Sequence, residues 1–182
     1  MTPTRNPYWH PADRLHRGRV PAEVRAWLFA GGSLTAHVRA RCPERFRLRI
    51  LRQRVAPPRR DEARLLGIPP GGRALVREIE LCCGTQPLVV ARTIIPLASL
   101  RGRQQRLAGL GRRPLGALLF ADRSARREPY QIARLTLRQA GIAQPPMVAA
   151  PVWGRRAVFR LGGAPLLVSE FFLPVLYAAR AD

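Results

Sequence analysis

The chain has 182 residues, a length that suits one domain of ordinary size with a buried core. Its formal net charge is +21, from 32 basic and 11 acidic residues, and every basic residue is arginine because lysine is absent. Complete replacement of lysine indicates a compositional bias of the source genome, and the arginines are spread along the chain without a nucleic-acid-reading motif, so we expect no nucleic-acid partner.

The N-terminal part of the chain predicts short elements. Residues 1–19 are rich in Arg, Pro and His and lack periodicity, which predicts a basic, poorly ordered lead-in to a single domain over residues 20–182. Apolar residues at helical spacing behind Pro21 predict a short helix that ends at Gly31-Gly32. Ser33 is a typical N-cap for a second helix.

The next segments predict a strand, a helical turn and a hairpin. Phe46, Leu48 and Ile50 alternate with arginines, the pattern of a strand with one solvent face. A Pro- and Arg-rich segment, 57–73, contains a helical turn around Asp61 to Leu66. The stretch ALVREIELCCGTQPLVVARTIIP, residues 74–96, then predicts two strands joined at Gly84-Thr85.

Helices and a second hairpin complete the predicted domain. Leu- and Arg-rich residues 100–110 and PLGALLF from Pro114 predict two helices, and a strand is expected around Tyr130 to Leu135. Segment 136–151 is predicted to be an inserted loop. The last predicted element is a hairpin that turns at Gly162-Gly163. Hairpins with helices grouped between them predict an α+β fold, a single antiparallel β-sheet with helices packed on one side.

Two arginines occupy apolar faces of the first hairpin. Side chains alternate along a strand, so Arg77 shares a face with Leu75 and Ile79, and Arg92 shares a face with aliphatic neighbours. A two-residue turn would place Arg77 directly opposite Arg92, although a bulge would break that register. The charge of such a buried arginine must be compensated in one of three ways. It can bind a carboxylate ligand, pair with a carboxylate from another element of the protein, or reach solvent by snorkelling. Glu78 is a poor candidate because its strand parity puts it on the other face.

Glu170 interrupts the apolar run PLLVSEFFLP. A carboxylate in apolar surroundings suits a general acid or a hydrogen-bond donor. The alternative is a structural ion pair, because a two-residue turn at Gly162-Gly163 places Arg155 opposite Glu170. The pattern alone favours the ion pair.

The remaining chemistry-bearing residues predict no metal or cofactor site. The three histidines lack metal-site spacing, and no phosphate-binding or dinucleotide-binding glycine motif is present. Cys42, Cys82 and Cys83 are odd in number and two are adjacent, so we expect no disulfide framework, and a reducing cytoplasm fits. No apolar stretch is long and unbroken enough for a membrane span.

Three stretches together resemble the chorismate pyruvate-lyase family: LVREIELCCGTQPLVVARTIIP, LGRRPLGALLF and WGRRAVFRLGGAPLLVSEFFLP, with GGSLT near residue 33. The resemblance implies an antiparallel sheet that encloses the ligand under helical flaps. It also implies a cofactor-independent carbon–oxygen lyase that converts chorismate to pyruvate and 4-hydroxybenzoate, used for ubiquinone biosynthesis. We expect a cytoplasmic monomer.

The resemblance also assigns site residues. The carboxylate-binding arginine falls on Arg77, a backbone contact to the same carboxylate on Leu115, the acidic residue near the 4-oxygen on Glu170, and a flap residue on Leu34. Arg92 is expected near the enolpyruvyl carboxylate, so Glu170, Arg77 and Arg92 are the expected catalytic residues.

One non-catalytic alternative remains open at this point. Effector-binding modules of transcription regulators resemble the same fold and bind small molecules without chemistry. Such modules usually follow a DNA-reading helix-turn-helix, for which the stretch before Pro21 is too short.

Overall fold

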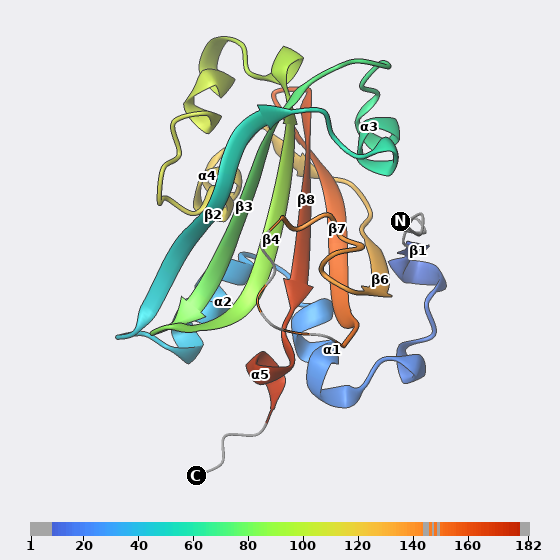
Figure 1. Ribbon diagram of the computed structural model, residues 1–182, viewed down its shortest axis with the longest axis vertical. Helices are drawn as coiled ribbons and strands as arrows, with labels where there is room; N and C mark the ends of the chain where they lie inside the picture. The colour runs from blue at the N-terminus through green and yellow to red at the C-terminus, as the bar shows by residue number, and fades with distance from the viewer. Residues whose placement is uncertain (1–8, 144–145, 147, 149, 179–182) are drawn as a thin grey trace.

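The protein is built on one antiparallel sheet. The computed structural model describes residues 9–143, 146, 148 and 150–178, and within them eight strands pair in the order β1-β6-β7-β8-β4-β3-β2, with β5 beside β7 (Figure 1). The strands are β1 (His10–Pro11), β2 (Phe46–Ala56), β3 (Ala74–Cys83), β4 (Gln86–Pro96), β5 (Ala125–Arg127), β6 (Gln131–Leu135), β7 (Val152–Leu161) and β8 (Ala164–Phe172).

Short helices connect and cover these strands. The α-helices are α1 (Ala22–Leu28), α2 (Leu34–Arg41), α3 (Arg60–Leu66), α4 (Leu115–Ala121) and α5 (Pro174–Tyr177). Four 3-10 turns are η1 (Ala12–Arg14), η2 (Arg17–Arg19), η3 (Leu97–Ser99) and η4 (Gly102–Leu107). The helix predicted over residues 100–110 is therefore a 3-10 segment, whereas the helix predicted behind Pro114 is present as α4.

Both predicted hairpins form with the predicted turns. Cys83 pairs with Gln86 across Gly84-Thr85, and Leu161 pairs with Ala164 across Gly162-Gly163. Gly162 and Gly163 have φ of 58° and 85°, values that favour glycine and match the turns that suit a twisted two-strand ribbon.

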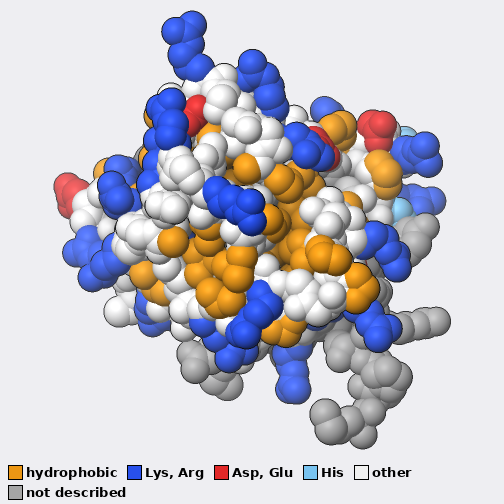
Figure 2. Space-filling model, turned by 90° about the horizontal axis from the view of Figure 1, so that it is seen from above, with side chains coloured by type: hydrophobic (Ala, Val, Ile, Leu, Met, Phe, Trp, Pro, Cys, Tyr) orange, Lys and Arg blue, Asp and Glu red, His pale blue; other side chains and the backbone are white. Residues whose placement is uncertain are grey.

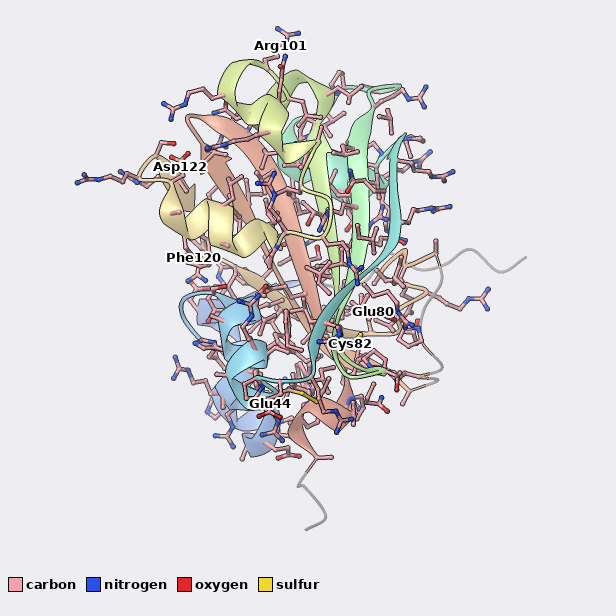
Figure 3. All side chains as sticks on the ribbon, turned by 90° about the vertical axis from the view of Figure 1, so that its left-hand side faces the viewer. Glu44, Glu80, Cys82, Arg101, Phe120 and Asp122 are labelled. Atoms are coloured by element: carbon pink, nitrogen blue, oxygen red, sulfur yellow. A yellow bond between two sulfur atoms is a disulfide. The ribbon has the colours of Figure 1, made fainter. Side chains whose placement is uncertain are left out.

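One face of the sheet, which we call the flap face, carries α1, α2 and α4. Near one end of the strands, α1 and α2 pack on Leu81, Val89 and Phe172. Near the other end, α4 and η4 pack on Leu75 and Leu166. Figure 3 shows α4, marked by Phe120, and the blue helices on the same side of the sheet. The space between these two apolar clusters is where the candidate site lies.

The opposite face, the back face, is covered by α3 and by part of segment 136–151. Leu66 of α3 packs with Val76, Ile94 and Leu167, and the back-face cluster beside it includes Leu137, Ala140 and Ile142. The α+β class and the single antiparallel sheet are thus as predicted, with α3 added on the second face. Residues 144–145, 147 and 149 of the expected insertion lie outside the described residues.

The lead-in is more structured than the sequence predicts. His10 pairs with Ile132 and Pro11 with Gln131, which adds β1 to the edge of the sheet. The backbone N–H of Ala12 donates to the carbonyl of Tyr130 at 3.0 Å. Residues 1–8 lie outside the described residues, but residues 10–19 have defined elements that the local composition did not indicate.

The cysteine prediction is wrong. Cys42, at the C-terminal end of α2, forms a disulfide with Cys83, the last residue of β3, and Cys82 is free and buried. The antiparallel pairing of β2 with β3 brings Cys83 opposite Phe46, close to the end of α2. The bond ties the helix to the sheet.

Positive charge from arginine is spread over the surface of the protein rather than gathered in one patch. Figure 2 shows arginine side chains around the rim of one face, with apolar side chains grouped between them and few acidic groups. None of the described helices is long and apolar enough to cross a membrane.

Candidate active site

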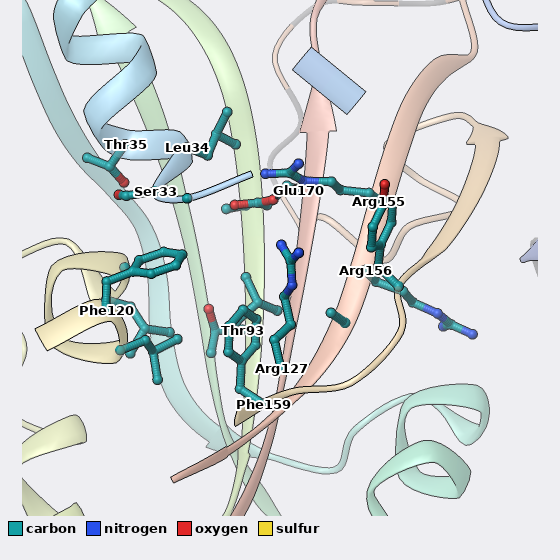
Figure 4. Close-up of a pocket in the computed structure, with 18 of the residues that line it drawn as sticks. Ser33, Leu34, Thr35, Thr93, Phe120, Arg127, Arg155, Arg156, Phe159 and Glu170 are labelled. Atoms are coloured by element: carbon teal, nitrogen blue, oxygen red, sulfur yellow. Dashed lines mark hydrogen bonds and ion pairs between the residues drawn. The ribbon is translucent and has the colours of Figure 1, made fainter. Parts of the chain in front are cut away.

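A cavity opens on the flap face between the two apolar clusters (Figure 4). Its floor comes from four central strands: Ile79, Ala91, Thr93, Ala157, Val168 and Glu170. One wall is the start of α2 and the other is α4, while Arg127, Tyr130 and Arg155 complete the lining on a third side. Leu34 and Leu115, two of the predicted site residues, line these two walls together with Glu170 on the floor.

The two walls touch each other. Ser33 caps α2, and its Oγ accepts a hydrogen bond from the N–H of Ala36 at 3.4 Å, which places Leu34 at the first turn. Gly116 on α4 faces this cap: a Cβ at that position would lie 3.2 Å from Ser33 Oγ. A side chain there would require Ser33 Oγ to shift by a few tenths of an ångström, so glycine suits the close approach of α2 and α4.

Glu170 forms an ion pair on the cavity floor. It lies directly opposite Arg155, whose Nε donates to Glu170 Oε2 at 2.6 Å. Arg155 Nη1 also donates to the carbonyls of Trp27, Leu28 and Ala30 at 3.3, 3.3 and 2.7 Å. These carbonyls belong to the C-terminal end of α1 and the residues after it, a favourable place for a cation. The predicted cross-strand pair is confirmed, and it lies in a cavity.

Arg77 lies on the flap face, directly opposite Thr93 of the floor, but it is not itself among the lining residues. Its side chain is buried and donates to Gln53 Oε1 at 2.9 Å and to the carbonyls of Gly111 and Arg113 at 2.7 and 3.3 Å. Burial lowers the pKa of the Arg77 guanidinium. Within the described residues, no carboxylate pairs with this cation.

Arg77 and Glu170 lie on the same face of the sheet, two strands apart. Ala91 on β4 pairs with Glu170 on β8 and with Ile79 on β3, so Arg77 is two strands and two residues away from Glu170. Strand geometry puts their Cα atoms about 12 Å apart, with both side chains on the flap face. Glu170 lies on the cavity floor, while the guanidinium of Arg77 lies beside the lining, against the loop that precedes α4.

Arg92 lies on the back face, which contradicts its expected place opposite Arg77. Its partner in the ladder is Glu78. Arg92 donates to Glu78 Oε1 at 2.5 Å, to Glu62 Oε1 and Oε2 at 2.7 and 3.1 Å, and to the carbonyl of Gly141 at 3.3 Å. Burial acts to lower the pKa of Arg92, but the hydrogen bonds and charges of Glu62 and Glu78 outweigh it and raise that pKa. The protein's own acids therefore neutralise Arg92.

A bulge explains the error. Leu81 pairs with Val89, but Cys82 pairs with Pro87, so Leu88 is an extra residue on β4. One extra residue reverses the faces of every later side chain on that strand. Pro87 lacks the N–H that a regular ladder needs, and it is the one local signal in the sequence for this irregularity.

Several cavity residues were not predicted. Arg127 comes from the three-residue strand β5, which the sequence did not indicate, and Tyr130 follows it. Thr93 and Phe120 lie in predicted elements but carry no motif. In the described part of the chain, no group of three or more His, Cys, Asp or Glu residues could hold a metal ion.

Comparisons with known proteins agree with these features. A family model described as chorismate lyase matches residues 4–181. A probable chorismate pyruvate-lyase from Methylococcus capsulatus is 44% identical over 155 residues, which cover 84% of this chain and 96% of the relative. A protein of the same description from Aromatoleum aromaticum is 46% identical over 169 residues, covering 90% of this chain and 91% of the relative.

Solved structures show the same fold at low identity. The effector domain of PhnF from Mycobacterium smegmatis matches with a TM-score of 0.53 and 16% identity, over 81% of this chain and 92% of that one. A GntR-family transcriptional regulator from Bacillus cereus matches with a TM-score of 0.52 and 12% identity, over 76% and 99%. At these identities the likeness concerns the fold alone.

Proposed function

The chain belongs to the chorismate lyase family, and on that premise we propose that it eliminates pyruvate from chorismate and releases 4-hydroxybenzoate. Chorismate is a dianion with one carboxylate on its ring and one on its enolpyruvyl group. The cavity under α2 and α4 is the site that we assign to it.

The buried cation of Arg77 is the observation that carries this proposal. Its three acceptors are neutral oxygens, and its charge has no carboxylate partner in the described residues. A desolvated cation of this kind is stabilised by an anion, and the guanidinium fork matches a carboxylate. We assign the ring carboxylate to Arg77. The loop that binds Arg77 leads into Leu115, whose N–H begins α4 and is assigned to the same carboxylate.

Glu170 takes the other end of the ring in this proposal. Arg155 fixes the orientation of the Glu170 carboxylate, which faces the cavity. We assign Glu170 to the ether oxygen of the substrate and to the neighbouring ring hydroxyl, which the product keeps. Leu34, on the opposing wall, covers the ring.

The reaction needs positioning and control of charge and protons. The ether bond between the ring carbon and the enolpyruvyl oxygen breaks, and the oxygen keeps the electron pair. The ring loses a proton and becomes aromatic, and the departing enolpyruvate gains a proton on carbon to become pyruvate. Aromatisation supplies the driving force, so the protein contributes orientation and stabilisation of the charge on the leaving group.

The wider setting of the activity is also part of the proposal. We assign the product to ubiquinone biosynthesis and expect a cytoplasmic monomer that needs no cofactor. In a reducing compartment Cys42 and Cys83 would be thiols, so the disulfide is the feature to test against this location. Sedimentation of the purified protein at several concentrations measures the oligomeric state.

The experiment is incubation of the purified protein with chorismate in buffer that contains a chelator. Pyruvate and 4-hydroxybenzoate are measured separately, and we expect equal amounts of both. Ala91→Leu is the blocked control, because Ala91 lies on the floor between Glu170 and Ile79 and a longer side chain fills the cavity. That variant should fold and lose activity. Failure of the wild-type protein to form either product contradicts the proposal.

A further inference from the structure

The cavity needs a second cation if it accepts a dianion, and Arg92 cannot supply it from the back face. Three arginines line the cavity. Arg155 is engaged with Glu170 and three carbonyls. Arg156 donates to Asp61 Oδ2 and Gln131 Oε1, both at the back face. Arg127 is the third.

The Arg127 guanidinium carries a charge that no described carboxylate neutralises. Its guanidinium carbon lies 5.4 Å from the centroid of the Tyr130 ring, a cation–π contact that orients the side chain and leaves its charge available. Its backbone pairs with Phe159 of β7, which also lines the cavity. Figure 4 shows the Arg127 side chain extending from the strand toward Glu170.

Arg127 is also placed differently from Arg77. Arg77 is buried on the flap face, beside the cavity lining and next to the start of α4, whereas Arg127 is exposed at the edge of the cavity, on the short strand β5. The departing group of the substrate must leave toward solvent. An exposed cation beside Glu170 is suited to the carboxylate that leaves, and a buried one to the carboxylate that stays.

We propose that Arg127 binds the enolpyruvyl carboxylate of chorismate, a role that rests on the proposed function. During elimination the departing group gains negative charge on its oxygen while it keeps its carboxylate. A cation that contacts this group therefore stabilises the transition state more than the ground state. Arg127 contributes to turnover as well as to substrate affinity, and contributes little to affinity for 4-hydroxybenzoate, which lacks the enolpyruvyl group.

The test compares Arg127→Gln with Arg126→Gln. Arg126 is the preceding residue of β5, and its side chain donates to the carbonyls of Arg123 and Ala125, away from the cavity lining. Both variants lose one positive charge, so the long-range attraction between the protein and an anionic substrate falls by the same amount in each. Arg127→Gln should lower kcat/KM for chorismate by about 10- to 100-fold, the loss expected for one charge-assisted hydrogen bond, and Arg126→Gln by less than about 2-fold. The Kd for 4-hydroxybenzoate should stay within about 2-fold in both variants.

Each outcome decides the proposal. Equal weakening of chorismate turnover and product binding in Arg127→Gln would show a structural effect and overturn the role. Unchanged turnover, or an equal loss in Arg126→Gln, would also overturn it. Partial recovery in Arg127→Lys supports it. If wild-type protein forms no pyruvate, the proposed function fails. The Kd for chorismate in Arg127→Gln, Arg127→Lys and Arg126→Gln then still measures whether Arg127 binds the second carboxylate.

Discussion

Glu170 and Arg155 face each other across strands β8 and β7, with the Arg155 Nε donating to Glu170 Oε2 at 2.6 Å on the floor of a cavity. The pair is both structural and accessible to a ligand. Glu170→Gln keeps an oxygen that accepts from Arg155 but removes the charge and the ability to exchange a proton. We expect kcat to fall about 100-fold, a typical contribution of general acid–base catalysis.

Rapid-quench measurement of a single turnover checks this prediction independently of product release. The thermal midpoint of Glu170→Gln serves as the folding control. A single-turnover rate within about 2-fold of wild type would mean that the substrate transfers its proton internally, and the acid role of Glu170 would be withdrawn.

Arg77 is predicted to determine affinity for the ring carboxylate. Arg77→Leu should raise the Kd of 4-hydroxybenzoate by about 100-fold, because a charge-assisted bidentate contact is lost. The same variant leaves the acceptors at Gln53 and Gly111 without a donor, so its unfolding free energy should also fall, by about 1–3 kcal/mol. Calorimetric titration of the product measures the first effect and urea denaturation the second.

Arg113→Leu is the matched control for Arg77→Leu. Arg113 contributes its carbonyl to Arg77, and its side chain is exposed, so this variant removes a charge from the same region without removing the contact. Product affinity in Arg113→Leu should stay close to that of wild type. A folded Arg77→Leu protein with normal product affinity would remove the carboxylate anchor.

Arg92 is predicted to act on stability rather than on the ligand. Arg92→Leu leaves the carboxylates of Glu62 and Glu78 buried without their cation, which should lower the unfolding free energy by about 3–5 kcal/mol. Adding Glu62→Gln and Glu78→Gln to this variant should recover part of the loss. Urea denaturation measures both effects, and an unchanged midpoint in Arg92→Leu would contradict the assignment.

The disulfide predicts a specific thiol count. Unfolded, unreduced protein should show one reactive thiol, Cys82, and reduced protein should show three. In the folded protein Cys82 should react slowly, because burial and the charge of Glu80 raise the pKa of its thiol. The bond closes a segment with a sequence separation of 41, so replacing Cys42 and Cys83 by serine should cost up to about 4 kcal/mol. Three thiols before reduction would contradict the bond.

The pKa of Asp122 predicts how the turn between α4 and β5 responds to acid. The hydroxyl and backbone N–H of Ser124 and the guanidinium of Arg106 bind its carboxylate and lower its pKa from 3.8 to about 2 (Figure 3). Because the folded-state pKa is depressed, the stabilisation is present above pH 3.8 and is lost as the pH falls through about 2. Carboxyl NMR shifts measure the midpoint, Asp122→Asn identifies the signal, and a midpoint near 3.8 would contradict the turn geometry.

Local turn chemistry accounts for what the sequence predicted well. Gly162-Gly163 allows a two-residue turn, and the register counted back from it places Arg155 opposite Glu170 as observed. The same counting from Gly84-Thr85 failed beyond Cys82, since the extra residue at Leu88 shifts β4. A register is therefore predictable only as far as the ladder is unbroken, and Pro87 marks the place where it breaks.

Features that depend on distant parts of the chain were not predictable. Arg127 reaches the cavity because β5 pairs with β7, and three residues are too few to show a strand pattern. Cys42 meets Cys83 through the pairing of β2 with β3, which sequence spacing does not reveal. The partners of Arg92 come from β3, from α3 and from the segment at Gly141, and the last two are distant from Arg92 in sequence.

The contact between Ser33 and Gly116 joins two walls that belong to separately packed apolar clusters. The same two helices bury Leu34 and Val38 in one cluster and Leu115 and Leu119 in the other. Moving either helix away from its neighbour would therefore expose part of its own cluster, so the packing that stabilises the fold also limits how far the two walls can separate.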